Sequence, residues 1–208
     1  HLAVLNDAEK KIKEKNLLDE KKRERKKEKK VAKGHISPDY AARKRVYVLS
    51  FEGNINASAV ANLREEITAV LTTATSSDEV LLRLESSGGM VHSYGLAASQ
   101  LDRLRKKNIP ITVSVDKVAA SGGYMMACVG DCIIAAPFAV LGSIGVVAQL
   151  PNFNRVLKHN KIDFELLTAG EYKRTLTLFG ENTEKGRDKF VNELEETHQL
   201  FKQYVSCL

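Results

Sequence analysis

From residue 44 onward, the chain alternates between short apolar runs that predict strands and longer segments with apolar residues at helical spacing. The predicted strands and extended segments occupy residues 45–51, 79–86, 111–116, 132–137, 142–149 and 163–170. The predicted helices occupy residues 57–73, 93–107, 121–130 and 152–160, and a charged amphipathic helix begins at Thr183. Strands that alternate with helices in this way are typical of parallel βαβ units. The pattern therefore predicts a single α/β domain over residues 44–208.

Several predicted strands are almost continuously apolar, as residues 79–86 are. Such runs indicate a parallel sheet that is covered on both faces. We therefore expect helices, or other parts of the protein, on each side of the sheet.

The basic charge of the chain is concentrated before the predicted domain. Residues 1–33 contain 13 Lys and Arg against 7 Asp and Glu, whereas the remaining residues contain 19 of each kind. Strong helix formers and opposite charges four residues apart fill this segment, so residues 1–43 are interpreted as a basic helical or disordered linker. A basic linker also suits an anionic membrane surface. The neutral remainder argues against nucleic-acid binding, which usually requires a basic face.

Cysteine usage and hydropathy narrow the class of protein further. The three cysteines do not suggest a disulfide framework, and Cys128 and Cys132 lack a His or Cys partner at zinc-binding spacing. No window reaches the roughly 18 apolar residues of a membrane span, and no signal peptide is evident. The chain begins at His1 and ends within a predicted helix. We therefore expect a piece of a longer protein with a truncated C-terminus.

Two glycine-rich turns, each at the end of a predicted strand, are candidates for chemistry. In the first, residues 85–89 (Glu-Ser-Ser-Gly-Gly), uncovered backbone N–H groups could stabilise an oxyanion, although paired glycines more often form a simple turn. The second turn places Ser121 before Gly122 at a strand-to-helix junction. Serine there is usually only a helix N-cap, but small neighbours would let a substrate approach its hydroxyl. The helix N-terminus also supplies free N–H donors, the first of them at Gly122.

A serine nucleophile needs a base, and none of the five histidines lies in a motif-like context. Lys173 would ordinarily be a solvated charge. As a general base it must be neutral near pH 7, so its pKa must fall from about 10.4 toward about 7 or 8. Burial in an apolar pocket has this effect, and Leu176, Leu178 and Phe179 could form such a pocket.

Taken together, four motifs resemble the signal peptide peptidase A family of serine proteases. They are ESSGG at 85–89, KVAASGGYMMA at 117–127, GSIGVV at 142–147 and AGEYK at 169–173, in the order seen in that family. The likeness covers residues 44–205, roughly four fifths of the chain. It implies the fold of the Clp protease and crotonase superfamily, a spiral of ββα units. Ser87 departs from the pattern, because relatives often have proline before the two glycines.

The resemblance implies a serine endopeptidase with a Ser-Lys dyad, in which Ser121 is the nucleophile and Lys173 the general base. The N–H groups of Gly88 and Gly122 would form the oxyanion hole. The family acts on hydrophobic or signal-peptide-like substrates without a cofactor or metal. The resemblance also implies a homo-oligomeric ring with a periplasmic catalytic domain. The ring would be anchored in the bacterial inner membrane by a membrane segment that precedes the linker at residues 1–43. Some relatives complete the dyad across subunits, and the sequence does not decide which arrangement applies here.

Two other functions are compatible with the same residues. A crotonase-type acyl-CoA enzyme shares the fold and a two-amide oxyanion hole, but it needs an active-site glutamate and no serine nucleophile. A catalytically silent membrane scaffold would keep the fold and the ring alone. Both alternatives predict that a serine-reactive probe leaves Ser121 unlabelled.

Overall fold

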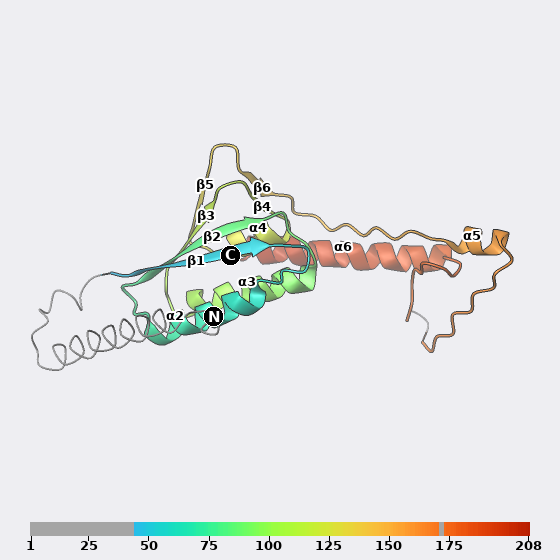
Figure 1. Cartoon of the computed structure of the whole chain (residues 1–208), viewed down its shortest axis with the longest axis horizontal. Coiled ribbons are helices and arrows are strands. Elements are labelled where there is room, and N and C mark those ends of the chain that lie inside the picture. The colour runs from blue at the N-terminus through green and yellow to red at the C-terminus, as the bar shows by residue number, and fades with distance from the viewer. Residues whose placement is uncertain (1–43, 171–172) are drawn as a thin grey trace, which may run out of the picture. The chain divides into compact units, whose positions relative to one another are not determined.

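The computed structural model describes residues 44–170 and 173–208, and Arg45–Leu208 forms one compact unit. The predicted linker at residues 1–43 lies outside the described residues and stays a prediction. The strands are β1 (Val46–Gly53), β2 (Glu79–Ser86), β3 (Ile111–Val115), β4 (Val118–Ala120), β5 (Cys132–Ala135) and β6 (Val140–Gly142). The helices are α2 (Val60–Thr73), α3 (Val91–Arg105), α4 (Gly122–Ala127), α5 (Asn154–His159) and α6 (Glu184–Ser206) (Figure 1).

The described strands form one six-stranded sheet in which every pairing is parallel. Strand β2 pairs with β1 and with β3, and its last residue, Ser86, pairs with Ala119 of β4. Strand β5 then adds beside β3, and β6 adds beside β4. The units β3–β4–α4 and β5–β6–α5 therefore repeat a strand–strand–helix order. This arrangement confirms the predicted α/β class and its ββα repeat.

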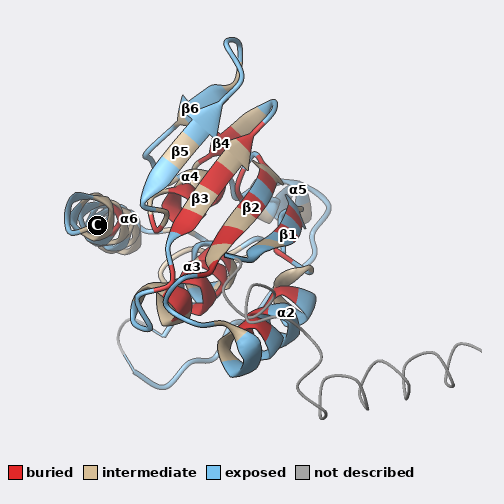
Figure 2. Cartoon of the chain, turned by 90° about the vertical axis from the view of Figure 1, so that its left-hand side faces the viewer, coloured by how far each residue is buried: buried red, intermediate tan, exposed pale blue. Residues whose placement is uncertain are grey.

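The hydrophobic core lies between the sheet and helices α2, α3 and α4. Buried residues recur on one side of each long helix, and Figure 2 shows them on the sides that face the central strands. Each fully buried Leu, Ile or Val contributes about 1.5–3 kcal/mol relative to an exposed one. The fully buried aliphatic residues that join the helices to the strands include Leu63, Ile67, Leu101, Leu104, Val80, Leu82 and Ile111.

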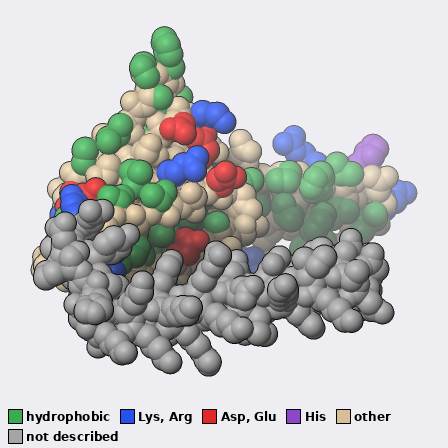
Figure 3. Space-filling model, turned by 60° about the vertical axis from the view of Figure 1, so that its left-hand side comes forward, with side chains coloured by type: hydrophobic (Ala, Val, Ile, Leu, Met, Phe, Trp, Pro, Cys, Tyr) green, Lys and Arg blue, Asp and Glu red, His purple; other side chains and the backbone are tan. Residues whose placement is uncertain are grey.

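The other face of the sheet is exposed in the described part of the chain. The exposed fraction is 56% for Val48 on β1 and 57% for Ile134 on β5. Figure 3 shows acidic and basic side chains side by side on the surface, among hydrophobic ones. The expectation that both faces are covered is therefore met for one face only. A continuously apolar strand indicates that both of its faces are suited to burial. It does not indicate which part of the protein covers each face.

Three further differences from the predicted elements concern short or unpartnered segments. Strand β4 was not predicted because it has only three residues. The predicted extended segment 142–149 is strand only at its first residue, where β6 ends. The prediction of a strand at 163–170 was wrong, because no described strand pairs with it and its Leu167 is 89% exposed. A short apolar run cannot form a strand without a neighbour that accepts and donates the backbone hydrogen bonds. No described helix combines the length and apolar character needed to cross a membrane.

A buried carboxylate fastens the start of β1 to the turn before β2. Asp78 is 1% exposed and accepts hydrogen bonds from the Arg45 side chain, at 2.7 Å from Nη2, and from the Arg45 backbone N–H at 2.8 Å. The backbone N–H and hydroxyl of Thr75 also donate to it, at 2.8 and 2.9 Å. The Arg45 and Thr75 hydrogen bonds hold the pKa of Asp78 well below its ordinary value of 3.8.

We expect Asp78 to make the protein sensitive to acid. A carboxylate with a lowered pKa adds stability above its unfolded-state pKa, and this stability is lost as the pH falls below about 4. Asp78→Asn should lower the melting temperature at pH 7 and flatten its dependence on pH below 5, as measured by circular dichroism. Glu181→Gln, which breaks the exposed pair with Lys158, is the control and should change little. Equal acid sensitivity in Asp78→Asn and the parent chain would contradict this account.

Candidate active site

Ser121 joins β4 to α4 in a backbone conformation that residues other than glycine rarely adopt. Its φ is +52° and its ψ is −120°. A hydrogen bond from the Ser121 N–H to the Gly142 carbonyl oxygen (2.8 Å) ties the turn to β6, and the Met125 N–H donates to the Ser121 carbonyl (2.9 Å). Such strain costs about 1–3 kcal/mol and persists only where surrounding contacts impose it.

The Ser121 hydroxyl is not used as a helix cap. Ser121 occupies the N-cap position of α4, but its side chain accepts no capping hydrogen bond, and the residue is only half-buried. The simpler interpretation of this serine, as an N-cap, is therefore not what the structure shows. The hydroxyl stays available at the end of the β4–α4 turn.

Gly88 lies directly against Ser121. Its φ is +90°, and a Cβ atom added there would stand 2.7 Å from the Ser121 Cβ and 2.8 Å from the Gly122 nitrogen. The pairing of Ser86 with Ala119 causes this contact, because it brings the carboxyl ends of β2 and β4 to the same edge. The structure thus brings together three of the predicted site residues, Ser121, Gly88 and Gly122.

The two predicted oxyanion donors differ in their partners. The Gly122 N–H opens α4 and has no acceptor among the described residues. The Gly88 N–H donates to the Ser86 hydroxyl oxygen at 3.0 Å. Ser86 in turn lies 2.6 Å from the Tyr94 hydroxyl, so a second layer of polar side chains supports the turn. Neither Ser86 nor Tyr94 was predicted to have a role in the site. The one available signal was a serine at the buried end of a strand.

The described residues do not connect Lys173 with Ser121. Lys173 is exposed, and its backbone N–H donates to the Gly170 carbonyl oxygen at 3.4 Å. The two residues before it lie outside the described part of the chain. The role of Lys173 as general base therefore stays a prediction.

An apolar pocket of about 300 Å³ is lined in part by residues that follow Lys173 closely in the sequence. The Phe179 ring packs against those of Phe164 and Phe153, with centroids 5.7 and 6.0 Å away. Leu176, Leu178 and Phe179, the three residues predicted to form an apolar pocket, all line it. Lys173 itself is not among the lining residues, which also include Leu150, Phe164, Leu166, Arg174 and Thr177.

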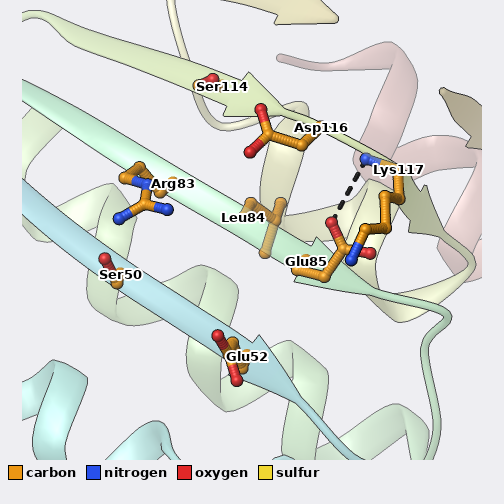
Figure 4. Close-up of a pocket in the computed structure, with 8 residues that line it drawn as sticks. All are labelled: Ser50, Glu52, Arg83, Leu84, Glu85, Ser114, Asp116 and Lys117. Atoms are coloured by element: carbon orange, nitrogen blue, oxygen red, sulfur yellow. Dashed lines mark hydrogen bonds between the residues drawn. The ribbon is translucent and has the colours of Figure 1, made fainter. Parts of the chain in front are cut away.

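A second cavity, of about 160 Å³, opens on the exposed face of the sheet where β1, β2 and β3 end (Figure 4). Its walls carry both charge signs, and the Lys117 N–H donates to a Glu85 carboxylate oxygen at 3.2 Å. No group of acidic, histidine or cysteine side chains suited to a metal ion occurs in the described residues. Glu85 and Lys117 lead directly into the turns of Gly88 and Ser121. The remaining lining residues are Ser50, Glu52, Arg83, Leu84, Ser114 and Asp116.

Two family models match the chain. Residues 103–207 match the family described as Peptidase family S49, and residues 2–101 match Peptidase family S49 N-terminal. The chain therefore belongs to peptidase family S49.

Curated relatives and one solved structure extend the comparison. The chain is 65% identical over 163 residues to the probable protease SohB of Buchnera aphidicola subsp. Schlechtendalia chinensis, which covers 78% of the chain and 53% of that protein. It is 68% identical over 161 residues to the probable protease SohB of Haemophilus influenzae, with 77% and 46% covered. The chain thus spans about half the length of these relatives. It also resembles a mutant membrane-bound stomatin-specific protease solved with a substrate peptide (TM-score 0.42, 16% identity, 78% and 66% covered).

We expect Gly122 to tolerate no side chain. A Cβ atom there would lie 2.3 Å from Cγ of the buried Tyr94 ring, so Gly122→Ala must move the α4 turn. The expected cost is about 1–3 kcal/mol in the free energy of unfolding, measured by urea denaturation. The matched control is Gly95→Ala on α3, where an added Cβ meets nothing within 4 Å. That variant should gain about 0.5–1 kcal/mol because alanine favours helix. Equal stability of the two variants would refute the close approach at Gly122.

Proposed function

We propose that this domain is a serine endopeptidase in which Ser121 is the nucleophile and Lys173 the general base. The observation that carries the proposal is the strained Ser121 turn, in which the hydroxyl makes no capping hydrogen bond. In this turn the Ser121 Cβ and the Gly122 nitrogen both lie against Gly88. A hydroxyl in this position can attack a carbonyl while a backbone N–H donates a hydrogen bond to the oxygen that develops negative charge. Membership of peptidase family S49 supports the same reaction.

The proposed reaction is acyl transfer in two steps. Ser121 Oγ forms a bond to the peptide carbonyl carbon while its proton passes to the neutral amine of Lys173. The carbonyl oxygen becomes an oxyanion that accepts hydrogen bonds from the N–H groups of Gly122 and Gly88. The C–N bond then breaks, and Lys173 returns the proton to the leaving amine. Water hydrolyses the acyl-enzyme by the same path, with Lys173 again taking a proton.

The proposal requires Lys173 to reach Ser121, which it does not contact in the described residues. Two arrangements satisfy this requirement. Either the Lys173 segment closes onto Ser121 of its own chain, or a ring of copies brings the lysine of one subunit to the serine of the next. Some members of the family that the motifs resemble use the second arrangement.

The proposed substrates are hydrophobic or signal-peptide-like peptides at the bacterial inner membrane. The apolar pocket of Leu176, Leu178 and Phe179 supports this choice, because it would accept an apolar side chain near Lys173. The resemblance to signal peptide peptidase A proteins supports a membrane-anchored parent protein with a periplasmic catalytic domain. The bacterial SohB relatives are compatible with that location.

The dyad predicts how the chain reacts with a fluorophosphonate probe. The parent chain should be labelled at Ser121, and labelling should rise with pH because only a neutral amine accepts the serine proton. Ser121→Ala should abolish labelling, and Lys173→Ala should reduce it by at least about 100-fold, the usual contribution of a general base. Lys158→Ala, which removes an exposed lysine on α5, is the control and should react normally. Labelling and peptide mapping by mass spectrometry provide the measurement.

Two results would reject this assignment. Folded and assembled chain that remains unlabelled at every pH would favour the crotonase-type or scaffold alternatives. Normal labelling of Lys173→Ala would remove the lysine from the mechanism while leaving Ser121 in place.

Mixing the two inactive variants distinguishes the arrangements of the dyad. If one subunit supplies Lys173 to the Ser121 of its neighbour, Ser121→Ala and Lys173→Ala chains mixed during refolding should regain peptide cleavage. Cleavage would return because some interfaces pair an intact serine with an intact lysine. Activity that stays at the level of the separate variants, in assemblies shown to contain both, would place the dyad within one chain.

A further inference from the structure

A buried chain of hydrogen bonds runs from the Gly88 turn back to the end of β1. The Gly88 N–H donates to Ser86 Oγ at 3.0 Å, Ser86 Oγ lies 2.6 Å from the Tyr94 hydroxyl, and that hydroxyl donates to the Asn54 carbonyl at 2.8 Å. Ser86 is 2% exposed and Tyr94 is fully buried. Polar groups buried to this extent must find partners within the protein, and these groups find them in one another.

The direction of each bond in the chain follows from the hydrogens available. A carbonyl oxygen can only accept, so the single hydroxyl hydrogen of Tyr94 points to Asn54. In the bond between the two hydroxyls, Ser86 must therefore donate and Tyr94 accept. This leaves the lone pairs of Ser86 Oγ to receive the Gly88 N–H. Each hydrogen bond polarises the next, which strengthens the whole series of hydrogen bonds.

The two hydroxyl-bearing residues also contact the backbone around the nucleophile. A Cβ atom at Gly122 would meet the Tyr94 ring at 2.3 Å, and one at Gly123 would meet the Ser86 carbonyl oxygen at 2.5 Å. On the other side, a Cβ at Gly53 would lie 2.4 Å from both hydroxyl oxygens. Ser86 and Tyr94 therefore lie beneath the turns of both proposed oxyanion donors.

We propose that Ser86 and Tyr94 are positioning residues that fix the Gly88 N–H for acylation of Ser121. This inference rests on the proposed function and deepens it. Ser86 holds the N–H through its hydroxyl oxygen, and Tyr94 fixes the rotation of that hydroxyl. A backbone N–H can be shared between two acceptors, so the forming oxyanion shares this donor with Ser86. The gain in rate comes from a donor that is already oriented before the reaction begins.

Tyr94→Phe and Ser86→Ala test this role. Removing an oxyanion donor typically costs about 100- to 1,000-fold in rate, and disordering one should cost less. We expect the maximal rate of fluorophosphonate labelling at saturating probe to fall about tenfold in Tyr94→Phe and about 10- to 100-fold in Ser86→Ala. The probe concentration at half-saturation should not change, because neither side chain contacts the probe. The matched control, Tyr47→Phe, loses a tyrosine hydroxyl bond to Thr73 at 3.2 Å, away from the site, and should label normally.

The double variant shows whether Tyr94 acts through Ser86. If it does, Tyr94→Phe should slow labelling no further once Ser86 has been replaced by alanine. If the fold losses in labelling rate multiply in the double variant, the two residues act independently. This result would overturn the proposal that Tyr94 acts through Ser86. Faster labelling of either single variant would mean that Ser86 withholds the Gly88 donor, and this also overturns the proposal.

Hydrogen exchange of the Gly88 amide, followed by NMR, separates this proposal from the proposed function. Exchange should be about tenfold faster in Tyr94→Phe and Ser86→Ala than in the parent chain, as the loss of a buried hydrogen bond implies. Unchanged exchange overturns the proposal whatever the labelling shows. Faster exchange with normal labelling overturns it too, while the Ser121 assignment stands. Faster exchange in the variants, together with an assembled parent chain that is never labelled, would reject the proposed function and, with it, any positioning role.

Discussion

The parallel pairing of Ser86 in β2 with Ala119 in β4 holds the two turns of the candidate site together. Beyond this pair, β2 continues into the Gly88 turn and β4 into Ser121, so the two turns must pass within contact distance. Only glycine fits at position 88, because its φ is positive and its Cα faces the Ser121 side chain. The same contact distance requires glycine at position 122, against the Tyr94 ring. The site is thus a consequence of where two strands end.

The strain at Ser121 is balanced by the elements on either side of it. Its N–H is bound to Gly142 at the end of β6, and its carbonyl starts α4. Ser86 and Tyr94 pack where three glycines have no side chain: their hydroxyls lie against Gly53, the Tyr94 ring lies against Gly122, and Ser86 lies against Gly123. The Ser121 side chain makes no capping hydrogen bond, and the first N–H of α4 has no acceptor in the described chain. These features suit nucleophilic attack better than they suit a capping role.

Much of this arrangement could be predicted from the sequence, and the exceptions have physical reasons. The strand at 79–86 and the helix at 57–73 were predicted because long periodic runs leave little choice of structure. The candidate serine and its neighbouring glycines were predicted from small residues at a strand-to-helix turn. The hydrogen bond from Tyr94 to Asn54 joins residues 40 positions apart, so no local pattern could indicate it. The strand predicted at 163–170 failed because a short apolar run does not show whether a partner strand exists.

The central claim is that Ser121 attacks a carbonyl whose oxygen accepts hydrogen bonds from the N–H groups of Gly122 and Gly88. The most direct test is a crystal structure of the chain after reaction with a hydrophobic peptide aldehyde. The account predicts a covalent bond from Ser121 Oγ to the aldehyde carbon, with the new oxygen about 2.7–3.1 Å from the nitrogens of Gly122 and Gly88. A bound aldehyde that makes no bond to Ser121, or an adduct whose oxygen points away from both glycines, would contradict it.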